Sequence, residues 1–450
     1  MNSLGTPADT IVAVATAQGR AGIGIVRVSG KDLTSLTSRL LGKLPAPRVA
    51  THCNFLGAED EPLDSGIALF FPAPASYTGE DILELQGHGG PVVLQMLLRR
   101  CVELGARLAE PGEFTRRAFL NGKIDLAQAE GISDLIEAAT ERAARCALRS
   151  LRGDFSATIQ EAANGLIELR ALVEATLDFP EEEIDAIHQA DVLKRLASLS
   201  DRVSRALMRG RQGSVLRNGL QVVLAGQPNV GKSSILNRLA GEEIAIVTEI
   251  PGTTRDPVRQ VIQVEGVPIH VTDTAGLRNT ADRVEAIGVA RAWEAIEKAD
   301  VLVLVIDART GVEAADNAVI ARLPGNLARV VVFNKIDVSG HAPGTTEDET
   351  GARIYLSAKT GEGMDRLRDA LLAAAGWRID SEDVFIARER HLAALERVSE
   401  ALAEARQHVA QGELLAEELR LVQRELGTIT GEFSTDDLLG EIFSRFCIGK

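Results

Sequence analysis

The chain has 450 residues, of which 45% are hydrophobic and 25% are charged, and its formal net charge is −15. This length is enough for about three domains of ordinary size, and a surface this acidic repels nucleic acid except at a local basic patch. The longest apolar runs, such as Val301–Ile306, are too short to cross a bilayer, and no signal-peptide pattern opens the chain. We therefore expect a cytoplasmic protein without membrane contact.

Four cysteines are present, and none of them forms a C-x-x-C pair: Cys53, Cys101, Cys146 and Cys447. This spacing indicates neither a zinc site nor a disulfide framework, and it fits a reducing compartment.

Residues 1–120 are predicted to form a mixed α/β domain. The helix Pro91–Leu104 has proline in its first turn, and Gly87–Gly90 before it is interpreted either as an oxyanion-hole loop or as a tight strand-to-helix turn. No G-x-S-x-G nucleophile follows, which favours the turn. The β-branched and apolar runs predicted as strands are Thr10–Thr16, Ile23–Val28, Ile67–Phe71 and Ile82–Leu85.

Residues 121–217 are predicted to be almost entirely helical. One helix, Ser133–Arg152, would carry four arginines on one face, either as a phosphate-binding stripe for RNA or as a solvated, salt-bridged face. These are Arg142, Arg145, Arg149 and Arg152. An acidic cluster around Pro180 is either a metal site or a charged helix start: Asp178, Glu181, Glu182, Glu183 and Asp185.

Residues 218–377 begin with an apolar run, Leu220–Ala225, a glycine-containing loop, Gly226–Ser233, and a helical pattern, Ile235–Leu239. Strand, loop and helix in this order predict a P-loop, whose backbone N–H groups cradle phosphates. Lys232 would reach the β- and γ-phosphates, and Ser233 would bind Mg²⁺.

Further GTPase signals follow in order along the chain. Asp273 ends an apolar run, Pro268–Thr272, where a Walker-B aspartate lies. Asn334 and Asp337 follow Val330–Phe333, and an amide with a carboxylate matches the guanine edge, since the carboxylate accepts from N1–H and the 2-amino group. The predicted GTP-binding residues are Asn229, Val230, Gly231, Lys232, Ser233, Ser234, Thr248, Glu249, Ile250, Pro251, Gly252, Thr253, Thr254, Asp273, Thr274, Ala275, Gly276, Asn334, Lys335, Asp337, Ser357, Ala358 and Lys359.

Alternating strands and helices in this region predict a mostly parallel sheet with helices on both faces. The acid-rich segment His341–Gly351 is expected to be a surface loop.

The position after D-T-A-G, where Ras-like enzymes hold a water-orienting glutamine, is Leu277. Asn229 can instead ligate a monovalent cation that stabilises transition-state charge. Glu285 either positions water or is a surface residue of a switch helix. We expect hydrolysis to depend on potassium and on dimerisation of the GTPase domains.

Helical character returns from Asp383 to Arg424, which suggests one helical domain interrupted by an inserted GTPase domain. The final segment, Thr435–Lys450, reads as a helix followed by F-C-I-G-K. Cys447 fits a prenylation signal poorly. It is either a buried structural cysteine or a reactive thiol beside Lys450.

The second half of the chain contains G-x-P-N-x-G-K-S, T-E-I-P-G-T-T-R-D, D-T-A-G-L-R and the terminal F-C-I-G-K. The first half contains G-E-D-I-L-E-L-Q-G-H-G-G and R-A-F-L-N-G-K-I-D-L-A-Q-A-E. This combination resembles the MnmE (TrmE) family of tRNA-modifying GTPases. The resemblance covers the full chain. It implies a folate-binding and dimerisation domain at 1–120, helical segments at 121–217 and 378–450, and an inserted Ras-like P-loop GTPase domain at 218–377.

The resemblance also implies a cytoplasmic homodimer that works on tRNA with the FAD-dependent protein MnmG (GidA), in a heterotetramer or larger complex. GTP, Mg²⁺, K⁺ and a 5-formyl- or methylene-tetrahydrofolate would be the cofactors, and the product an aminomethyl-type group at C5 of the wobble uridine. Glu285 would position water and Cys447 would act in the modification. The implied ligands are Arg27, Glu84, Lys123 and Lys450 for folate, Asn229, Thr248, Ile250 and Thr253 for potassium, and Ser233 and Thr254 for magnesium.

A ribosome-assembly GTPase that acts as a switch, without modification chemistry, explains the GTPase motifs equally well. It does not explain a folate-like first domain or the cysteine tail, so folate binding discriminates the two.

Overall fold

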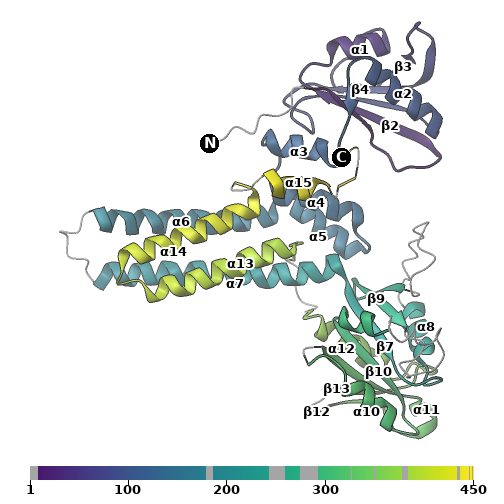
Figure 1. The fold of residues 1–450 in the computed structure, drawn as a ribbon, viewed down its shortest axis with the longest axis vertical. Helices are drawn as coiled ribbons and strands as arrows, with labels where there is room; N and C mark the ends of the chain where they lie inside the picture. The colour runs from purple at the N-terminus through teal and green to yellow at the C-terminus, as the bar shows by residue number, and fades with distance from the viewer. Residues whose placement is uncertain are drawn as a thin grey trace. The chain divides into compact units, whose positions relative to one another are not determined.

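The computed structural model describes residues 9–178, 186–242, 259–273, 292–325, 327–348, 351–377, 384–432, 436–444, 446–447 and 449. The chain packs as two compact units (Figure 1). The first comprises Met1–Ser133, Leu151–Pro180 and Gln411–Lys450, and the second comprises Asp134–Ser150 and Glu181–Ala410.

A six-stranded sheet in the order β3-β4-β5-β2-β1-β6 forms the centre of the first unit. Neighbouring strands are antiparallel except for β1 and β6, which are parallel. The strands are β1 Ile11–Val14, β2 Ala21–Gly30, β3 Thr51–Leu56, β4 Pro62–Phe71, β5 Asp81–Gly89 and β6 Arg107–Leu108. The predicted mixed α/β character of this part of the chain is confirmed.

One face of this sheet packs on two helices, α1 (Thr34–Leu41) and α2 (Pro91–Glu103). Alternate strand residues such as Val26 and Val28 enter this core, because successive side chains of a strand point to opposite faces. Arg27 lies between them in sequence and therefore belongs to the other face.

The oxyanion-hole interpretation of Gly87–Gly90 is wrong, because β5 continues through Gly89. The connection to α2 is Gly90 alone, which is the tight strand-to-helix turn that the sequence favoured, although it is shorter than predicted. The N–H of His88 donates to Asp64 Oδ2 at 2.8 Å and is therefore not available to an oxyanion. A Cβ on Gly87 would lie 2.3 Å from the same Asp64 oxygen, so a larger residue here would displace the Asp64 carboxylate from its hydrogen bond with His88.

The helices of the first unit include an adjacent pair, α6 and α14, joined by a hydrogen bond from Arg170 to Gln423 (Figure 1). The final helix, drawn in yellow, contributes Phe443 to a small core with Leu126, which Phe446 completes. The helices are α3 Glu113–Leu120, α6 Asp154–Asp178, α14 Gly412–Thr430 and α15 Asp436–Ser444, together with α4 Leu126–Glu137, of which the residues up to Ser133 belong to this unit.

The second unit contains a seven-stranded sheet in the order β12-β13-β11-β10-β7-β9-β8. Its five inner strands are parallel, and the edge strands β8 and β12 are antiparallel to their neighbours. The strands are β7 Leu220–Ala225, β8 Arg259–Val264, β9 Val267–Asp273, β10 Val301–Asp307, β11 Ala328–Asn334, β12 Gly344–Asp348 and β13 Gly351–Leu356. The predicted, mostly parallel sheet is confirmed.

Helices cover both faces of this sheet, as expected. Val303 of β10 packs into the core that includes α8 and α12, whereas its neighbour Leu304 packs toward α10 on the other face. The helices are α8 Lys232–Glu242, α10 Ala314–Ile320, α11 Ile336–Ser339 and α12 Met364–Ala374. The expectation of a loop over His341–Gly351 is wrong, since β12 pairs there with β13.

The predicted single helix Ser133–Arg152 is two helices, because α4 ends at Glu137 and α5 spans Glu141–Arg152. The break places Thr140 where its hydroxyl donates to the carbonyl of Gly266, in the turn between β8 and β9, at 2.8 Å. The guanidinium of Arg142 lies 4.6 Å from the ring centroid of Trp377, and Arg145 pairs with Glu141. These contacts favour the salt-bridged interpretation of the arginine face over an RNA stripe.

The remaining helices of the second unit, α7 (Ala186–Asn218) and α13 (Glu389–Gln407), pack against each other (Figure 1). Asp134, 4% exposed, accepts hydrogen bonds from Arg217 and Arg388. The helical stretch predicted to run to Arg424 is divided between α13 and α14. Across the described ranges, no helix is long and apolar enough to span a membrane.

Candidate functional site

The P-loop connects β7 to α8 at the carboxyl edge of the second sheet. A Cβ on Gly226 would lie 2.2 Å from the carbonyl of Val305, and one on Gly231 would lie 2.3 Å from Asn334 Nδ2. Both glycines also have positive φ, +142° and +99°. The loop therefore lies tightly against the ends of β10 and β11, and a side chain at either position would displace it.

Lys232 and Ser233 open helix α8, as predicted. In this structure the ammonium of Lys232 donates to the carbonyls of Gly226 and Gln227, at 2.9 and 3.1 Å. Its charge thus points into the concavity of its own loop, where a phosphate group would lie. Ser233 and Ser234 are exposed in the first helical turn, and a hydroxyl there fits the oxygen ligands that Mg²⁺ prefers.

Asp273 ends β9, which pairs in parallel with the P-loop strand and sets Asp273 opposite Leu224. The backbone of Asp273 thus lies at the same sheet edge as the P-loop, as expected for carboxyl ends of adjacent parallel strands. Its side chain is outside the description.

Asn334 joins the P-loop to the segment Ser357–Lys359. Its Nδ2 donates to the carbonyl of Val230 at 2.8 Å, and its Oδ1 accepts from the N–H of Ala358 at 3.0 Å. Because the side chain is only 2% exposed, Asn334 acts first as a connection between two loops. Sequence reasoning predicted it as a direct reader of the base.

Asp337 is exposed, and its Oδ1 accepts a hydrogen bond from the buried hydroxyl of Ser357 at 2.7 Å. The same hydroxyl accepts from the N–H of Thr360 at 3.2 Å. Ser357 therefore orients the carboxylate of Asp337, whose remaining lone pairs are open to a ligand. A carboxylate held in this way can accept two parallel N–H bonds from one planar base.

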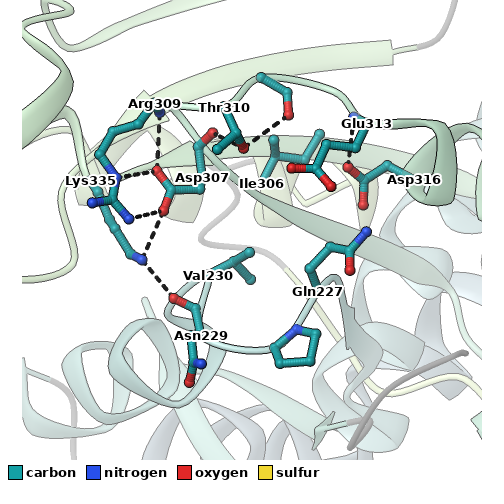
Figure 2. A pocket seen from close by; sticks show the side chains of 12 residues that line it. Gln227, Asn229, Val230, Ile306, Asp307, Arg309, Thr310, Glu313, Asp316 and Lys335 are labelled. Carbon is teal, nitrogen blue, oxygen red and sulfur yellow. Dashed lines mark hydrogen bonds and ion pairs between the residues drawn. The ribbon is translucent and has the colours of Figure 1, made fainter.

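A cavity of about 350 Å³ lies between the P-loop and the ends of β10 and β11 (Figure 2). The ammonium of Lys335 crosses it and donates to the carbonyl of Asn229 at 2.6 Å and to Asp307 Oδ2 at 2.9 Å. The residues that line it are Gln227, Pro228, Asn229, Val230, Ile306, Asp307, Arg309, Thr310, Gly311, Glu313, Asp316 and Lys335.

Asp307 and Arg309 were missed by the sequence analysis. Arg309 hydrogen-bonds both carboxylate oxygens of Asp307. This contact and the nearby Lys335 hold the pKa of Asp307 well below its usual range, although burial acts in the opposite direction. A signal was present in the sequence, since Asp307 directly ends the most apolar strand of the domain, between the two strands that deliver motif residues.

Several predicted residues lie outside the part of the chain that the structure describes. They are Thr248, Glu249, Ile250, Pro251, Gly252, Thr253, Thr254, Thr274, Ala275, Gly276, Leu277, Glu285 and Lys450, together with the acidic residues Glu181, Glu182, Glu183 and Asp185.

A second candidate site lies on the first sheet, where Arg27 and Glu84 are register partners on β2 and β5. Their side chains form an ion pair at 2.8 Å, and both are largely buried. The guanidinium of Arg27 also lies near two aromatic rings, 5.6 Å from the centroid of Tyr77 and 5.9 Å from that of Phe114. Charged groups flanked by aromatic rings suit a planar, polar ligand.

Lys123 approaches the same region through the loop that carries Tyr77. Its ammonium donates to the carbonyl of Pro74 at 3.0 Å, and Asn121 donates to the carbonyl of Thr78 at 2.7 Å. Lys123 and Arg27 thus both contact the segment from Pro74 to Tyr77, and Glu84 is joined to it through its ion pair with Arg27. The fourth predicted member, Lys450, is not described.

The C-terminal tail is seated on this unit by backbone contacts. Arg27 donates to the carbonyl of Gly449 at 3.3 Å, and the N–H of Gly112 donates to the carbonyl of Cys447 at 3.4 Å. Gly449 has φ +98°, and a Cβ there would lie 2.3 Å from the carbonyl of Val14. Only glycine permits this approach.

Cys447 is exposed, so its interpretation as a buried structural cysteine is wrong. It lines a cavity of about 810 Å³ whose other walls come from β1, the segment after it, α2 and the end of β6. Burial raises the pKa of the Cys53, Cys101 and Cys146 thiols. Among the four, Cys447 is the exposed one, Cys53 is half-buried, and Cys101 and Cys146 are buried.

Two protein families match the chain. The family described as "GTP-binding protein TrmE N-terminus" matches residues 10–123, and that described as "MnmE helical domain" matches residues 126–447. Relatives named tRNA modification GTPase MnmE align over nearly the whole chain. The protein from Thiobacillus denitrificans is 61% identical over 100% of both chains, and that from Nitrosomonas eutropha is 59% identical over 98% of this chain and 99% of its own.

Among solved structures, Era from Aquifex aeolicus is 28% identical over 40% of this chain and 65% of its own, with a TM-score of 0.28.

Proposed function

Because the chain belongs to the MnmE family of tRNA modification GTPases, we propose that it couples GTP hydrolysis to modification of C5 of the wobble uridine of tRNA. The observation that carries this proposal is the joining of the P-loop to the Ser357–Lys359 segment through the buried Asn334 amide. The loops that would bind the phosphates and the base are thereby held together at one sheet edge. The relatives' names speak against the alternative of a ribosome-assembly switch.

The residues fit a nucleotide with Mg²⁺. The glycines of the P-loop leave a concavity that Lys232 already enters with its charge, and Ser233 and Thr254 would supply oxygen ligands to the metal ion. The metal would neutralise charge on the β- and γ-phosphates. Asp337 would accept from the guanine N1–H and 2-amino groups. Glu285 would position the attacking water.

The cation proposal adds potassium at Asn229, with Thr248, Ile250 and Thr253. A potassium ion there would stabilise the developing charge on the phosphates. GTP hydrolysis at this site would also require two GTPase domains to dimerise.

The folate proposal uses Arg27, Glu84, Lys123 and Lys450 to bind a 5-formyl- or methylene-tetrahydrofolate. The ion pair and flanking rings of Tyr77 and Phe114 support it, since a pterin is planar and polar and a folate tail carries carboxylates. The folate would supply the one-carbon unit, and Cys447, seated beside Arg27 through Gly449, would act in the modification.

The proposed setting is a cytoplasmic homodimer that acts on tRNA together with the FAD-dependent protein MnmG (GidA), in a heterotetramer or larger complex. We propose the same domain division as from the sequence. The GTPase domain at 218–377 is inserted between the helical segments 121–217 and 378–450. Residues 1–120 would bind folate and dimerise.

We expect Asp337→Asn to weaken GDP binding by about a hundredfold, since two charge-assisted hydrogen bonds to guanine are lost. Xanthosine diphosphate should bind this variant better than GDP, because its C2 carbonyl accepts where the 2-amino group of guanine donates. Competition against a fluorescent nucleotide measures both effects. Asp365→Asn, an exposed aspartate on α12, is the matched control and should bind as the wild type does. Equal affinity of the wild type for ATP and GTP would contradict the assignment.

For the folate site, calorimetry of the full chain with 5-formyl-tetrahydrofolate should show binding that falls by about tenfold or more when Arg27 and Glu84 are both changed to alanine. Both residues are changed so that neither charge is left unpaired. Arg39→Ala, an exposed arginine on α1, should have no effect. Unaltered binding in the double variant would remove these two residues from the site.

A further inference from the structure

Asp307 lies at the centre of the nucleotide edge, although no GTPase motif contains it. It ends β10, the strand between the P-loop strand β7 and the Asn334 strand β11, and its register partner is Asn334. It is only 7% exposed. A buried carboxylate is costly unless it is paired, so its partners indicate its role.

The carboxylate of Asp307 is shared by two cations (Figure 2). Arg309 binds it with two hydrogen bonds, Nε to Oδ1 at 2.9 Å and Nη2 to Oδ2 at 2.6 Å, while Lys335 binds Oδ2 at 2.9 Å. The two-point contact with Arg309 fixes the plane of the carboxylate. Oδ2 is thereby aimed across the cavity at Lys335.

Lys335 passes this constraint to the P-loop. Its ammonium also donates to the carbonyl of Asn229 at 2.6 Å. Both residues have positive φ, +71° for Lys335 and +62° for Asn229, a conformation that side-chain-bearing residues adopt rarely and hold only when the surroundings fix it. The carbonyl–ammonium contact is the bond that joins these two strained positions.

We propose that Asp307 is a positioning residue of the guanine nucleotide site, which acts through the ammonium of Lys335 on the carbonyl of Asn229 and so sets the shape of the P-loop. This inference rests on the proposed nucleotide site. It adds a residue outside the motifs, and a mechanism by which the end of β10 tunes nucleotide affinity.

The physical reason lies in the lysine side chain. An ammonium has three donors on a flexible four-carbon stem. Asp307 and Asn229 occupy two of them and hold the stem extended across the cavity. When Asp307→Asn removes the negative charge, the ammonium keeps only neutral oxygen acceptors in the described cavity, and it can swing toward solvent. The P-loop then loses the contact that holds Asn229 in its αL conformation.

The test is a double-mutant cycle on the full chain, with a fluorescent GDP analogue as the probe. Asp307→Asn should weaken binding by about tenfold, the effect of one charge-assisted hydrogen bond. Lys335→Met should weaken it as well. Added to Lys335→Met, Asp307→Asn should have little further effect, because the ammonium through which it acts is gone.

The proposal would be overturned if Asp307→Asn weakened GDP binding by the same factor in the wild type and in Lys335→Met. A general loss of structure would weaken binding whether or not Lys335 is present. Unchanged binding by Asp307→Asn alone would also overturn the proposal. Glu313→Gln is the matched control, because Glu313 lines the same cavity and loses the same charge, and its affinity should stay within about twofold of the wild type. If Glu313→Gln lowered GDP affinity as much as Asp307→Asn, the effect would come from the total charge around the cavity, and the proposal would be overturned. Failure of the wild type to bind GDP would instead defeat the proposed nucleotide site.

Discussion

GTP turnover in potassium should exceed turnover in sodium at equal ionic strength by a factor that approaches a thousand, because the proposed potassium ion would take the place of an arginine finger. The expectation comes from the motif pattern: Leu277 leaves the water-orienting position apolar, and Asn229 is the P-loop residue placed to ligate a cation. Sodium is smaller and more strongly hydrated, so it fits a carbonyl-rich site less well.

The structure determines which variant tests Asn229. Its φ of +62° disfavours alanine, which would add backbone strain to the loss of the amide. Asn229→Gly removes the amide and tolerates the conformation. We therefore expect Asn229→Gly to hydrolyse GTP slowly in both salts.

GDP affinity serves as the control in the same experiment. In the wild type it should be alike in potassium and sodium, because the proposed cation would act on the transferred γ-phosphoryl group. Equal turnover in the two salts would refute the cation mechanism. Full turnover by Glu285→Ala would remove that residue from the catalytic assignment and leave the cation argument intact.

Strands with apolar sequences were predicted well, and the P-loop strand Leu220–Ala225 has the predicted bounds. Its residues are buried on both faces of a parallel sheet, and such strands read as continuous apolar runs. The edge strand β12 (Gly344–Asp348) was missed because an exposed edge needs no apolar pattern. Its polar sequence therefore looks like a loop.

Elements fixed by distant partners were not predictable from local sequence. The break between α4 and α5 places Thr140 on the carbonyl of Gly266, 126 residues away. Gly87 belongs to a strand because it pairs with Gly24 of the neighbouring strand β2. Likewise, Asp307 has no motif of its own, and its importance appears only when folding brings Lys335 to it.

The site residues divide in the same way. Lys232 and Asp337 could be identified because phosphate and guanine impose residue types at fixed spacing. The double role of Asn334 could not, since its partners Val230 and Ala358 come from two other loops.

The second large expected effect concerns Cys447 in the C-terminal tail. We expect Cys447→Ser to abolish tRNA modification while GTP turnover and Tm stay close to the wild type. Its contact with Gly112 uses the backbone carbonyl of Cys447 rather than the thiol, and the side chain is exposed. Serine should therefore keep the tail in its seat and remove only the chemistry of the thiol, because a hydroxyl is far less readily ionised than a thiol.

Two further variants separate chemistry from packing. Cys101→Ser places a hydroxyl in a fully buried position of the first core and should lower Tm while tRNA modification continues. Gly449→Ala retains the thiol but meets the carbonyl of Val14, so it should displace the tail and reduce modification. The measurements are the modified fraction of wobble uridine in tRNA, GTP turnover and thermal unfolding. If the thiol takes part in the chemistry, Cys447→Ser should reduce modification by about a hundredfold or more. A large fall in Tm for Cys447→Ser, or modification at the wild-type level, would show instead that the thiol has no chemical role and that the tail serves only to pack against the first sheet.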